Sequence, residues 1–211
     1  MSLRHAHSPY LYNKSYLLAA GSAVLLLICS IVVNWYAGIY ATERASSSVT
    51  DIILSNTRAY DVDWVFIYGA IIFWGFIVTL CVHDPKLLPF TFASIALFVL
   101  IRSVFISLTH IGPFPTAVPL DSDILNKFSF GGDLFFSGHT GLPFLVALIF
   151  WKRPLLRMLF LSAAGLFGVV VLLAHLHYTI DVLSAFFITY SIFHIAELLF
   201  KKERKIFYQG I

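Results

Sequence analysis

The chain has 211 residues, of which 59% are hydrophobic and only 12% are charged, and its formal net charge at pH 7 is +3. Soluble globular domains carry about 25% charged residues, and the mean hydropathy of this chain is +0.87. The composition therefore excludes an ordinary soluble domain and predicts an integral membrane protein, folded as one transmembrane domain over residues 1–211.

Hydropathy predicts six membrane-spanning segments, because apolar runs of about 20 residues recur along the chain. In chain order these segments are Tyr16–Tyr40, Trp64–Val82, Leu87–Leu108, Leu134–Trp151, Leu155–Ala174 and Tyr178–Phe200. The fourth is the weakest of the six, because Pro143 interrupts its first turns. The predicted fold is an all-α integral membrane protein with a bundle of six transmembrane helices.

Basic residues are distributed unevenly among the connections. Most lie at the N-terminus, in the second and fourth loops and in the C-terminal tail: Arg4, Lys14, Lys86, Lys152, Arg153, Arg157, Lys201, Lys202, Arg204 and Lys205. The other three loops contain only Arg44, Arg58 and Lys127. Because Lys and Arg accumulate on the cytoplasmic side of membrane proteins, both termini are predicted to be cytoplasmic, as an even number of spans requires.

Two of the predicted connections are long. Ala41–Asp63 is polar, and Thr109–Asp133 contains three prolines and ends on a pair of glycines and an aspartate. Long loops in compact folds are often functional. We therefore predict that Thr109–Asp133 forms a lid or a rim beside the polar stretch into which it leads.

Two short polar stretches stand at the edges of apolar runs, Gly131–Thr140 (GGDLFFSGHT) and His175–Asp181 (HLHYTID). In the predicted topology both lie at the outer membrane edge, as does Arg102 in the last third of the third span. Ionisable groups are costly at membrane depth and usually functional there. The sequence thus predicts an active site at the outer edge, facing the exoplasm, periplasm or lumen.

His177 and Asp181 are four residues apart and would share one face of a helix. A carboxylate that holds one imidazole nitrogen leaves the other to act as a nucleophile or base. The alternative is that Asp181 only caps the first turn of the last span, and that His177 merely ends the preceding loop.

Ser137, Gly138 and His139 stand immediately before an apolar run. Serine is a common N-cap, glycine lets the backbone approach a ligand closely, and the start of a helix binds phosphate well. An imidazole at this position can protonate a departing oxygen. The alternative is a capped helix with an interfacial histidine.

Arg102 would meet a buried anion, because an arginine inside a span is costly without one, and its planar guanidinium suits a phosphate group. A structural ion pair with Asp133, or a position at the outer interface, is the alternative. No cysteine and histidine spacing suggests zinc, so no metal is expected.

The strings GGDLFFSGHT and LLAHLHYTIDVLSAFFITY resemble the motifs of the sphingomyelin synthase family, which belongs to the wider type 2 phosphatidic acid phosphatase (lipid phosphate phosphatase) superfamily. The segment RSVFISLTHIGPFP is a third match, and the resemblance covers about residues 64–200. It implies six spans, an outward-facing site and no metal or other cofactor. The chain departs from the family at Leu176, where an aspartate is common between the two histidines.

By this resemblance, His177 attacks phosphorus and forms a phosphohistidine-type intermediate, and Asp181 orients and polarises His177. His139 protonates the leaving alcohol and later deprotonates the acceptor. The other predicted site residues bind substrate: Arg102, Asp133, Ser137, Gly138 and His175.

The basic signature of the phosphatase branch is missing. Val146 and Val171 stand where that branch has Lys and Arg. A phosphomonoester is close to dianionic near neutral pH and needs several basic groups, whereas the single Arg102 better matches the single charge of a phosphodiester. This favours transfer of a phosphorylated head group over release of inorganic phosphate.

The sequence therefore predicts a membrane-embedded phosphotransferase that moves a phosphoalcohol head group from a phospholipid to a lipid hydroxyl, such as that of ceramide or diacylglycerol. Its expected partners are these lipids and no nucleic acid, and the oligomeric state stays open. One alternative is a lipid phosphate phosphatase or phospholipase C-like hydrolase with water as acceptor. Another is a non-enzymatic transporter or scaffold, although a transport path would place polar groups near mid-bilayer on several spans.

Overall fold

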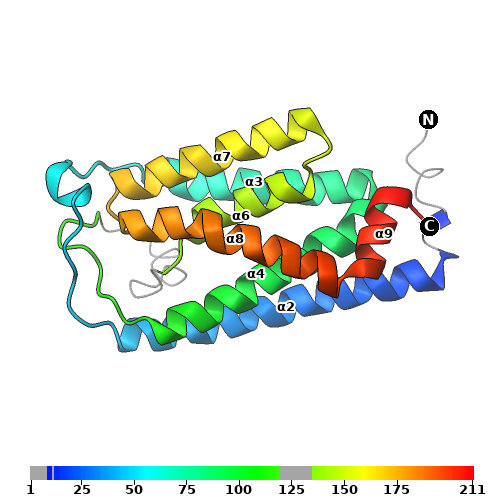
Figure 1. Cartoon of the computed structure of the whole chain (residues 1–211), viewed down its shortest axis with the longest axis horizontal. Coiled ribbons are helices and arrows are strands. Elements are labelled where there is room, and N and C mark those ends of the chain that lie inside the picture. The colour runs from blue at the N-terminus through cyan, green and yellow to red at the C-terminus, as the bar shows by residue number, and fades with distance from the viewer. Residues whose placement is uncertain (1–8, 11, 119–134) are drawn as a thin grey trace.

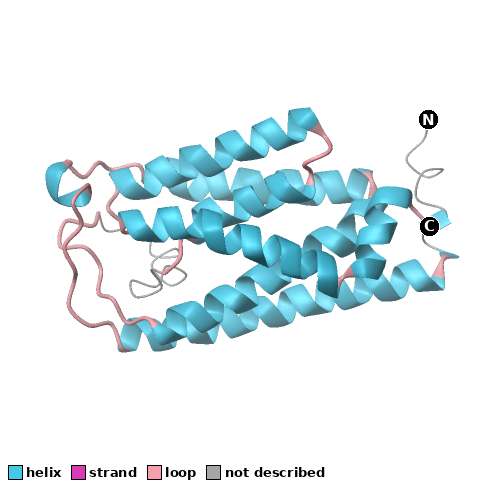
Figure 2. Cartoon of the chain, in the orientation of Figure 1, coloured by secondary structure: helices cyan, strands magenta, loops and turns pink. Residues whose placement is uncertain are grey.

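A computed structural model of the chain describes residues 9–10, 12–118 and 135–211. Every regular element in these ranges is a helix. The long helices run along the long dimension of the molecule (Figure 1), and most of the loops gather at one end of it (Figure 2). Within the described ranges, five helices are long and apolar enough to cross a membrane.

These five helices match five of the predicted spans to within three residues at each end. They are α2 (Lys14–Glu43), α3 (Asp63–His83), α4 (Leu88–Leu108, preceded by the 3-10 turn η2, Pro85–Leu87), α7 (Pro154–Leu173) and α8 (Thr179–Leu199). Local signals set several of the ends. The side chain of Asn13 accepts a hydrogen bond from the Tyr16 amide at 3.0 Å and caps α2, and Pro154 takes the first position of α7.

The fourth predicted span is shorter than expected. The prediction was a helix over Leu134–Trp151, but α6 covers Gly138–Ile149, which is 12 residues, or about 18 Å against a hydrocarbon core of about 30 Å. Leu134 itself lies outside the described residues. Helix α6 packs against α4, α7 and α8, so it is covered by protein and its length need not match the bilayer. Within the described residues, five of the six predicted spans therefore have membrane length, and the fourth is a shorter apolar helix.

Small residues let α6 sit deep among its neighbours. A Cβ atom on Gly141 would lie 2.8 Å from the Phe98 ring of α4 and 2.8 Å from the Thr189 hydroxyl of α8. Real Cβ contacts are longer than this, so any side chain at Gly141 would force the Phe98 ring and the Thr189 side chain to shift. This close packing brings the first turn of α6 next to the first turn of α8.

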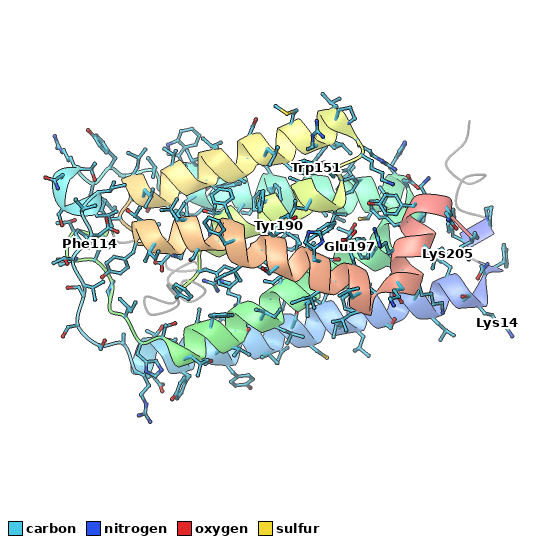
Figure 3. The ribbon with its side chains drawn as sticks, viewed as in Figure 1. Lys14, Phe114, Trp151, Tyr190, Glu197 and Lys205 are labelled. Atoms are coloured by element: carbon cyan, nitrogen blue, oxygen red, sulfur yellow. The ribbon has the colours of Figure 1, made fainter. Side chains whose placement is uncertain are left out.

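Helix α9 (Lys201–Gln209) lies in the C-terminal segment, which the sequence predicts only as a basic tail. Ile206 and Phe207 are buried, whereas the lysines of this helix are exposed. The Phe207 ring packs against Phe90 and Phe150. Figure 3 shows Lys14 and Lys205 at this end of the bundle and Phe114 at the other, so that the molecule has a basic end and a loop end.

Candidate active site

The two polar stretches meet through a backbone hydrogen bond. The amide of Ser137, which begins α6, donates to the carbonyl of Asp181 in the first turn of α8 at 3.1 Å. Both residues are fully buried. The contact lies at the loop end of the bundle, where α6 and α8 begin (Figure 1).

His177 and Asp181 face each other across the start of α8. The Nδ1 atom of His177 lies 3.6 Å from Oδ2 of Asp181, which is longer than a hydrogen bond. The same carboxylate oxygen accepts the backbone amide of Tyr178 at 2.9 Å and so caps the helix. Asp181 Oδ1 is buried and accepts no hydrogen bond from the part of the chain that the structure describes. Asp181 thus both faces His177, as the first hypothesis predicts, and caps the first turn of α8, as the alternative predicts.

His139 lies in the first turn of α6 and is half-buried. Its ring stacks on the Phe66 ring of α3 with the centroids 3.9 Å apart, and it meets Phe167 of α7 edge-on at 5.9 Å. Gly138, the residue before His139, lies against Arg102. Ser137 is bonded to Asp181, which faces His177, so these groups gather around the first turns of α6 and α8. Phe66 could not be predicted from the sequence, because nothing in a uniformly apolar span shows which aromatic residue will contact the histidine.

Arg102 packs directly on the first turn of α6. It is 8% exposed, and its Nε donates to the carbonyl of Phe136 at 2.9 Å. A Cβ atom on Gly138 would lie 3.3 Å from Nε and 3.7 Å from Cζ of Arg102. The absence of a side chain at Gly138 therefore lets the guanidinium lie against the backbone where α6 begins. Asp133, the other predicted partner, lies outside the described residues.

Ser137 acts as the N-cap of α6. Its Oγ accepts a hydrogen bond from the amide of Thr140 at 3.4 Å and another from the Thr140 hydroxyl at 3.3 Å. The structure therefore shows the capping role, and the contact with substrate stays a prediction.

His175 follows the end of α7 and contacts two loops. Its φ of 55° puts it in the left-handed position that usually follows a helix and usually holds glycine. The Thr116 hydroxyl lies 2.6 Å from Nδ1, and the Thr57 hydroxyl lies 3.4 Å from Nε2. Burial lowers the pKa of His175, while the charge of Asp51 acts in the opposite direction. Its predicted contact with substrate stays untested.

Asp51, which belongs to no motif of the sequence, holds the first long loop to α8. Its carboxylate accepts the amide of Thr179 at 2.7 Å, the hydroxyl of Thr179 at 2.9 Å and two amides beside the short turn η1 (Leu54–Asn56). Burial opposes the charge of Asp51, but these hydrogen bonds outweigh it and lower its pKa. An aspartate before a tight turn is a known local signal, but its partner 128 residues away is not visible in the sequence.

Tyr178 connects the two long loops through its hydroxyl group. Its hydroxyl donates to the carbonyl of Gly112 at 2.8 Å and accepts the amide of Val49 at 3.2 Å. The amide of Gly112 in turn donates to the carbonyl of Ser47. Residues 44–62, 109–118 and 174–178 thus form one hydrogen-bonded loop cluster at the end where α6 and α8 begin. The remainder of the predicted lid or rim, residues 119–133, lies outside the described residues.

Comparison with protein families finds a match over residues 131–198 to the model described as PAP2 superfamily C-terminal. The matched residues contain both polar stretches and the helices α6, α7 and most of α8. Neither the curated proteins nor the solved structures give a significant match. Residues 131–198 are thus similar to the C-terminal part of the type 2 phosphatidic acid phosphatase superfamily, and the five long apolar helices of the described ranges fit a multi-pass membrane protein.

Proposed function

We propose that the protein is a membrane-embedded phosphotransferase that moves a phosphoalcohol head group from a phospholipid to the hydroxyl of a second lipid. His177 is the nucleophile, Asp181 orients it, His139 is the general acid and base, and Arg102 holds the phosphate. The observation that supports this most strongly is the hydrogen bond from Ser137 to Asp181, because it brings the starts of α6 and α8 together.

The reaction has two half-reactions. In the first, Nε2 of His177 attacks the phosphorus, the bond from phosphorus to the diacylglycerol oxygen breaks, and that oxygen takes a proton from His139. Asp181, facing Nδ1, balances the positive charge on the His177 ring. In the second, the acceptor hydroxyl gives its proton to His139, its oxygen attacks the phosphorus, and the bond from phosphorus to nitrogen breaks. Both histidines return to their starting state.

The distribution of charge favours a phosphodiester substrate. Val146 and Val171, which replace the basic residues of the phosphatase branch, are both buried. Arg44 and Arg58 are exposed in the loop cluster, while Lys127 lies outside the described residues. Arg102 is therefore the buried arginine that supports the site, and one positive charge matches the single negative charge of a phosphodiester better than the near-dianion of a phosphomonoester.

We propose in addition that the chain crosses the membrane six times, with α6 as the short fourth crossing and both termini in the cytoplasm. The basic end of the bundle then faces the cytoplasm. The starts of α6 and α8 face the exoplasm, periplasm or lumen, and the site opens toward the outer leaflet.

The deciding experiment supplies detergent-purified protein with a phospholipid labelled in its head group, with and without ceramide or diacylglycerol. A transferase yields a labelled lipid product only when the acceptor is present. The family match also fits a hydrolase, for which water is the acceptor. Release of a labelled phosphoalcohol, or of inorganic phosphate from a lipid phosphomonoester, at a rate that ceramide and diacylglycerol do not change would replace the transferase proposal by the hydrolase.

A further inference from the structure

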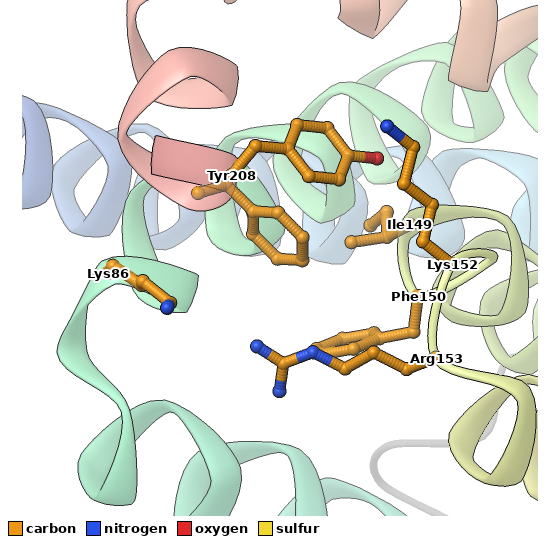
Figure 4. A pocket seen from close by; sticks show the side chains of 7 residues that line it. Lys86, Ile149, Phe150, Lys152, Arg153 and Tyr208 are labelled. Atoms are coloured by element: carbon orange, nitrogen blue, oxygen red, sulfur yellow. The ribbon is translucent and has the colours of Figure 1, made fainter. Parts of the chain in front are cut away.

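A pocket of about 150 Å³ lies at the basic end of the bundle, and Figure 4 shows the side chains that line it. The pocket is at the end of α6, whereas the candidate active site is at its start. A cavity needs only about 10–15 Å³ to hold one water molecule, so this one can admit a small polar group. Residues from η2, from the end of α6 and the turn after it, and from α9 line it: Lys86, Ile149, Phe150, Lys152, Arg153, Phe207 and Tyr208. The phosphotransfer mechanism uses none of them.

The rim of the pocket is positively charged. Lys86, Lys152 and Arg153 contribute three cations. One carboxylate, that of Asp84, lies 3.2 Å from Arg153 and 3.7 Å from Lys86. Lys152 lies 4.6 Å above the Tyr208 ring. The cations therefore exceed the carboxylate that pairs with them, and the pocket suits a ligand with negative charge.

The floor of the pocket is apolar, and the surface beside it is suited to lipid. Phe207 is buried between Phe90 and Phe150 and, with Ile149 and Phe150, lines the pocket. On the chain just after the rim, Leu155 is 82% exposed. A charged rim above an apolar floor, beside exposed apolar side chains, matches the region of a bilayer where head group and acyl chain meet.

We propose that this pocket binds the phosphate group of an anionic phospholipid in the leaflet that faces the basic end of the bundle. Lys86 and Lys152 contact the phosphate, Arg153 is held beside it by Asp84, and the hydroxyl of Tyr208 is a further donor. The acyl chains lie along the apolar surface near Leu155. The lipid is not a substrate, because the pocket and the two histidines stand at opposite ends of the helices.

Helix α9 makes this binding site possible. Phe207 and Tyr208 reach the pocket from α9, while Arg204 is held to the end of α8 by Glu197 at 2.7 Å. A lipid in the pocket therefore joins α9 to the start of α4 and the end of α6, and its binding should stabilise the folded protein.

The test titrates detergent-purified full-length protein with dioctanoyl phosphatidylglycerol, with dioctanoyl phosphatidylcholine and with inorganic phosphate. Binding is measured in about 0.5 M salt, where charges that do not contact the lipid directly are largely screened. The double variant Lys86→Gln/Lys152→Gln is compared with Lys201→Gln/Lys202→Gln. Both variants lose two positive charges, but the second pair is exposed on α9 and does not line the pocket.

We expect the anionic lipid to bind at least about ten-fold more tightly than the zwitterionic one. The pocket variant should weaken this binding by about ten-fold or more, and the control variant by less than about two-fold. Equal losses in the two variants, or equal binding of the two lipids, would overturn the proposal. Binding of inorganic phosphate as tight as that of the anionic lipid would show a site for free anions and overturn the lipid assignment.

The single variant Lys152→Gln guards against a folding defect in the double variant, because Lys152 is exposed. It should weaken binding of the anionic lipid by at least about three-fold with an unchanged melting temperature in the absence of lipid. Unchanged binding in this variant would remove Lys152 from the site. The readout is binding, so a failure of the proposed transferase activity would not affect the outcome.

Discussion

Arg102 and Gly138 act as one unit. The guanidinium can lie over the start of α6 only because position 138 has no side chain, and the bond from Nε to Phe136 fixes its orientation. A planar cation held against the positive end of a short helix is arranged to bind a negatively charged group. We therefore expect the phosphate to lie between Arg102 and the first amides of α6.

Replacing Arg102 by Gln should lower kcat/KM for the phospholipid by about 100-fold, because the charge that binds the phosphate is lost. Arg102→Lys should retain part of the activity, since lysine keeps the charge but not the fork of donors. The measurement is the rate of head-group transfer in purified protein. If kcat/KM of Arg102→Gln stays within about two-fold of the wild type, Arg102 does not bind the phosphate.

The substitution Gly138→Ala tests the contact between Arg102 and the backbone of α6 by changing the helix instead of the arginine. The new methyl group would stand 3.3 Å from Arg102 Nε, a distance that requires the guanidinium to shift by a few tenths of an ångström. Activity should fall by about ten-fold while the melting temperature changes little, because misplacement of a positioning group affects rate more than folding. A large loss of stability with normal kcat/KM would assign Gly138 to packing alone.

Helices differ in how far the sequence alone predicts them. The five long helices follow from apolar runs that match the bilayer, and their ends fall within three residues of the prediction. Helix α6 is different, because protein and not lipid surrounds it, and hydropathy carries no information on which neighbours will cover a segment. The amphipathic α9 is missed because its pattern is short and its basic residues read as a tail.

The candidate site is also only partly predictable. The spacing of His177 and Asp181 predicts that they are neighbours, and they do face each other, but His177 lies in the loop just before α8 and not on one helix face with Asp181. The contact of Phe66 with His139 and the bonds of Asp51 to Thr179 join residues far apart in the chain. Nothing local encodes such contacts, and they depend on how the helices pack.

The packing of α6 between α4 and α8 predicts that alanine substitutions at two glycines, Gly141 and Gly165, will have different effects on stability. Gly141→Ala should destabilise the protein by about 1–3 kcal/mol, because its methyl group would stand 2.8 Å from Phe98 and Thr189. Gly165→Ala, where nothing lies within 4 Å, should be neutral or slightly stabilising, since alanine favours helix more than glycine does. Thermal unfolding in detergent measures both. Equal melting temperatures would contradict the close packing of α6.

The hydrogen bonds of Asp51 should make the stability of the loop cluster depend on pH. The pKa of Asp51 is lowered in the folded protein from 3.8, so its charge stabilises the fold above about pH 4. That contribution is lost as the pH falls from 3.8 through the folded pKa. Asp51→Asn removes the charge and should cost about 1.5–3 kcal/mol at pH 7. The difference in melting temperature between wild type and variant should be largest near pH 7 and shrink below pH 4; a difference that grows in acid would contradict this role.

At the scale of the whole molecule, the two ends are chemically distinct. One end carries His139, His177, Asp181 and Arg102 near the loop cluster. The other end carries the lysines and arginines around α9. A bundle of this kind has one orientation in a membrane with a positive-inside bias. The two ends can then serve the two leaflets separately, one by chemistry and one by binding.

The proposed orientation predicts opposite accessibility for two single cysteines. In a variant without Cys29 and Cys81, Gln209→Cys at the end of α9 should react with a membrane-impermeant reagent only from the cytoplasmic side. Ser55→Cys in the loop cluster should react only from the outside, because Ser55 is exposed there. Labelling of both positions from one side, or the reverse pattern, would contradict the orientation.

The central claim is that His177 attacks a phosphorus atom that His139 also serves, and trapping of the intermediate tests it most directly. Protein is mixed with phospholipid carrying radiolabelled phosphorus, quenched in alkali and digested, with His194→Ala as a matched control at the basic end. The claim predicts label that is stable in alkali, lost in acid, confined to the peptide that contains His177, present in His194→Ala and absent from His177→Ala. Label that persists in His177→Ala, or active wild-type protein that carries no label, would contradict it.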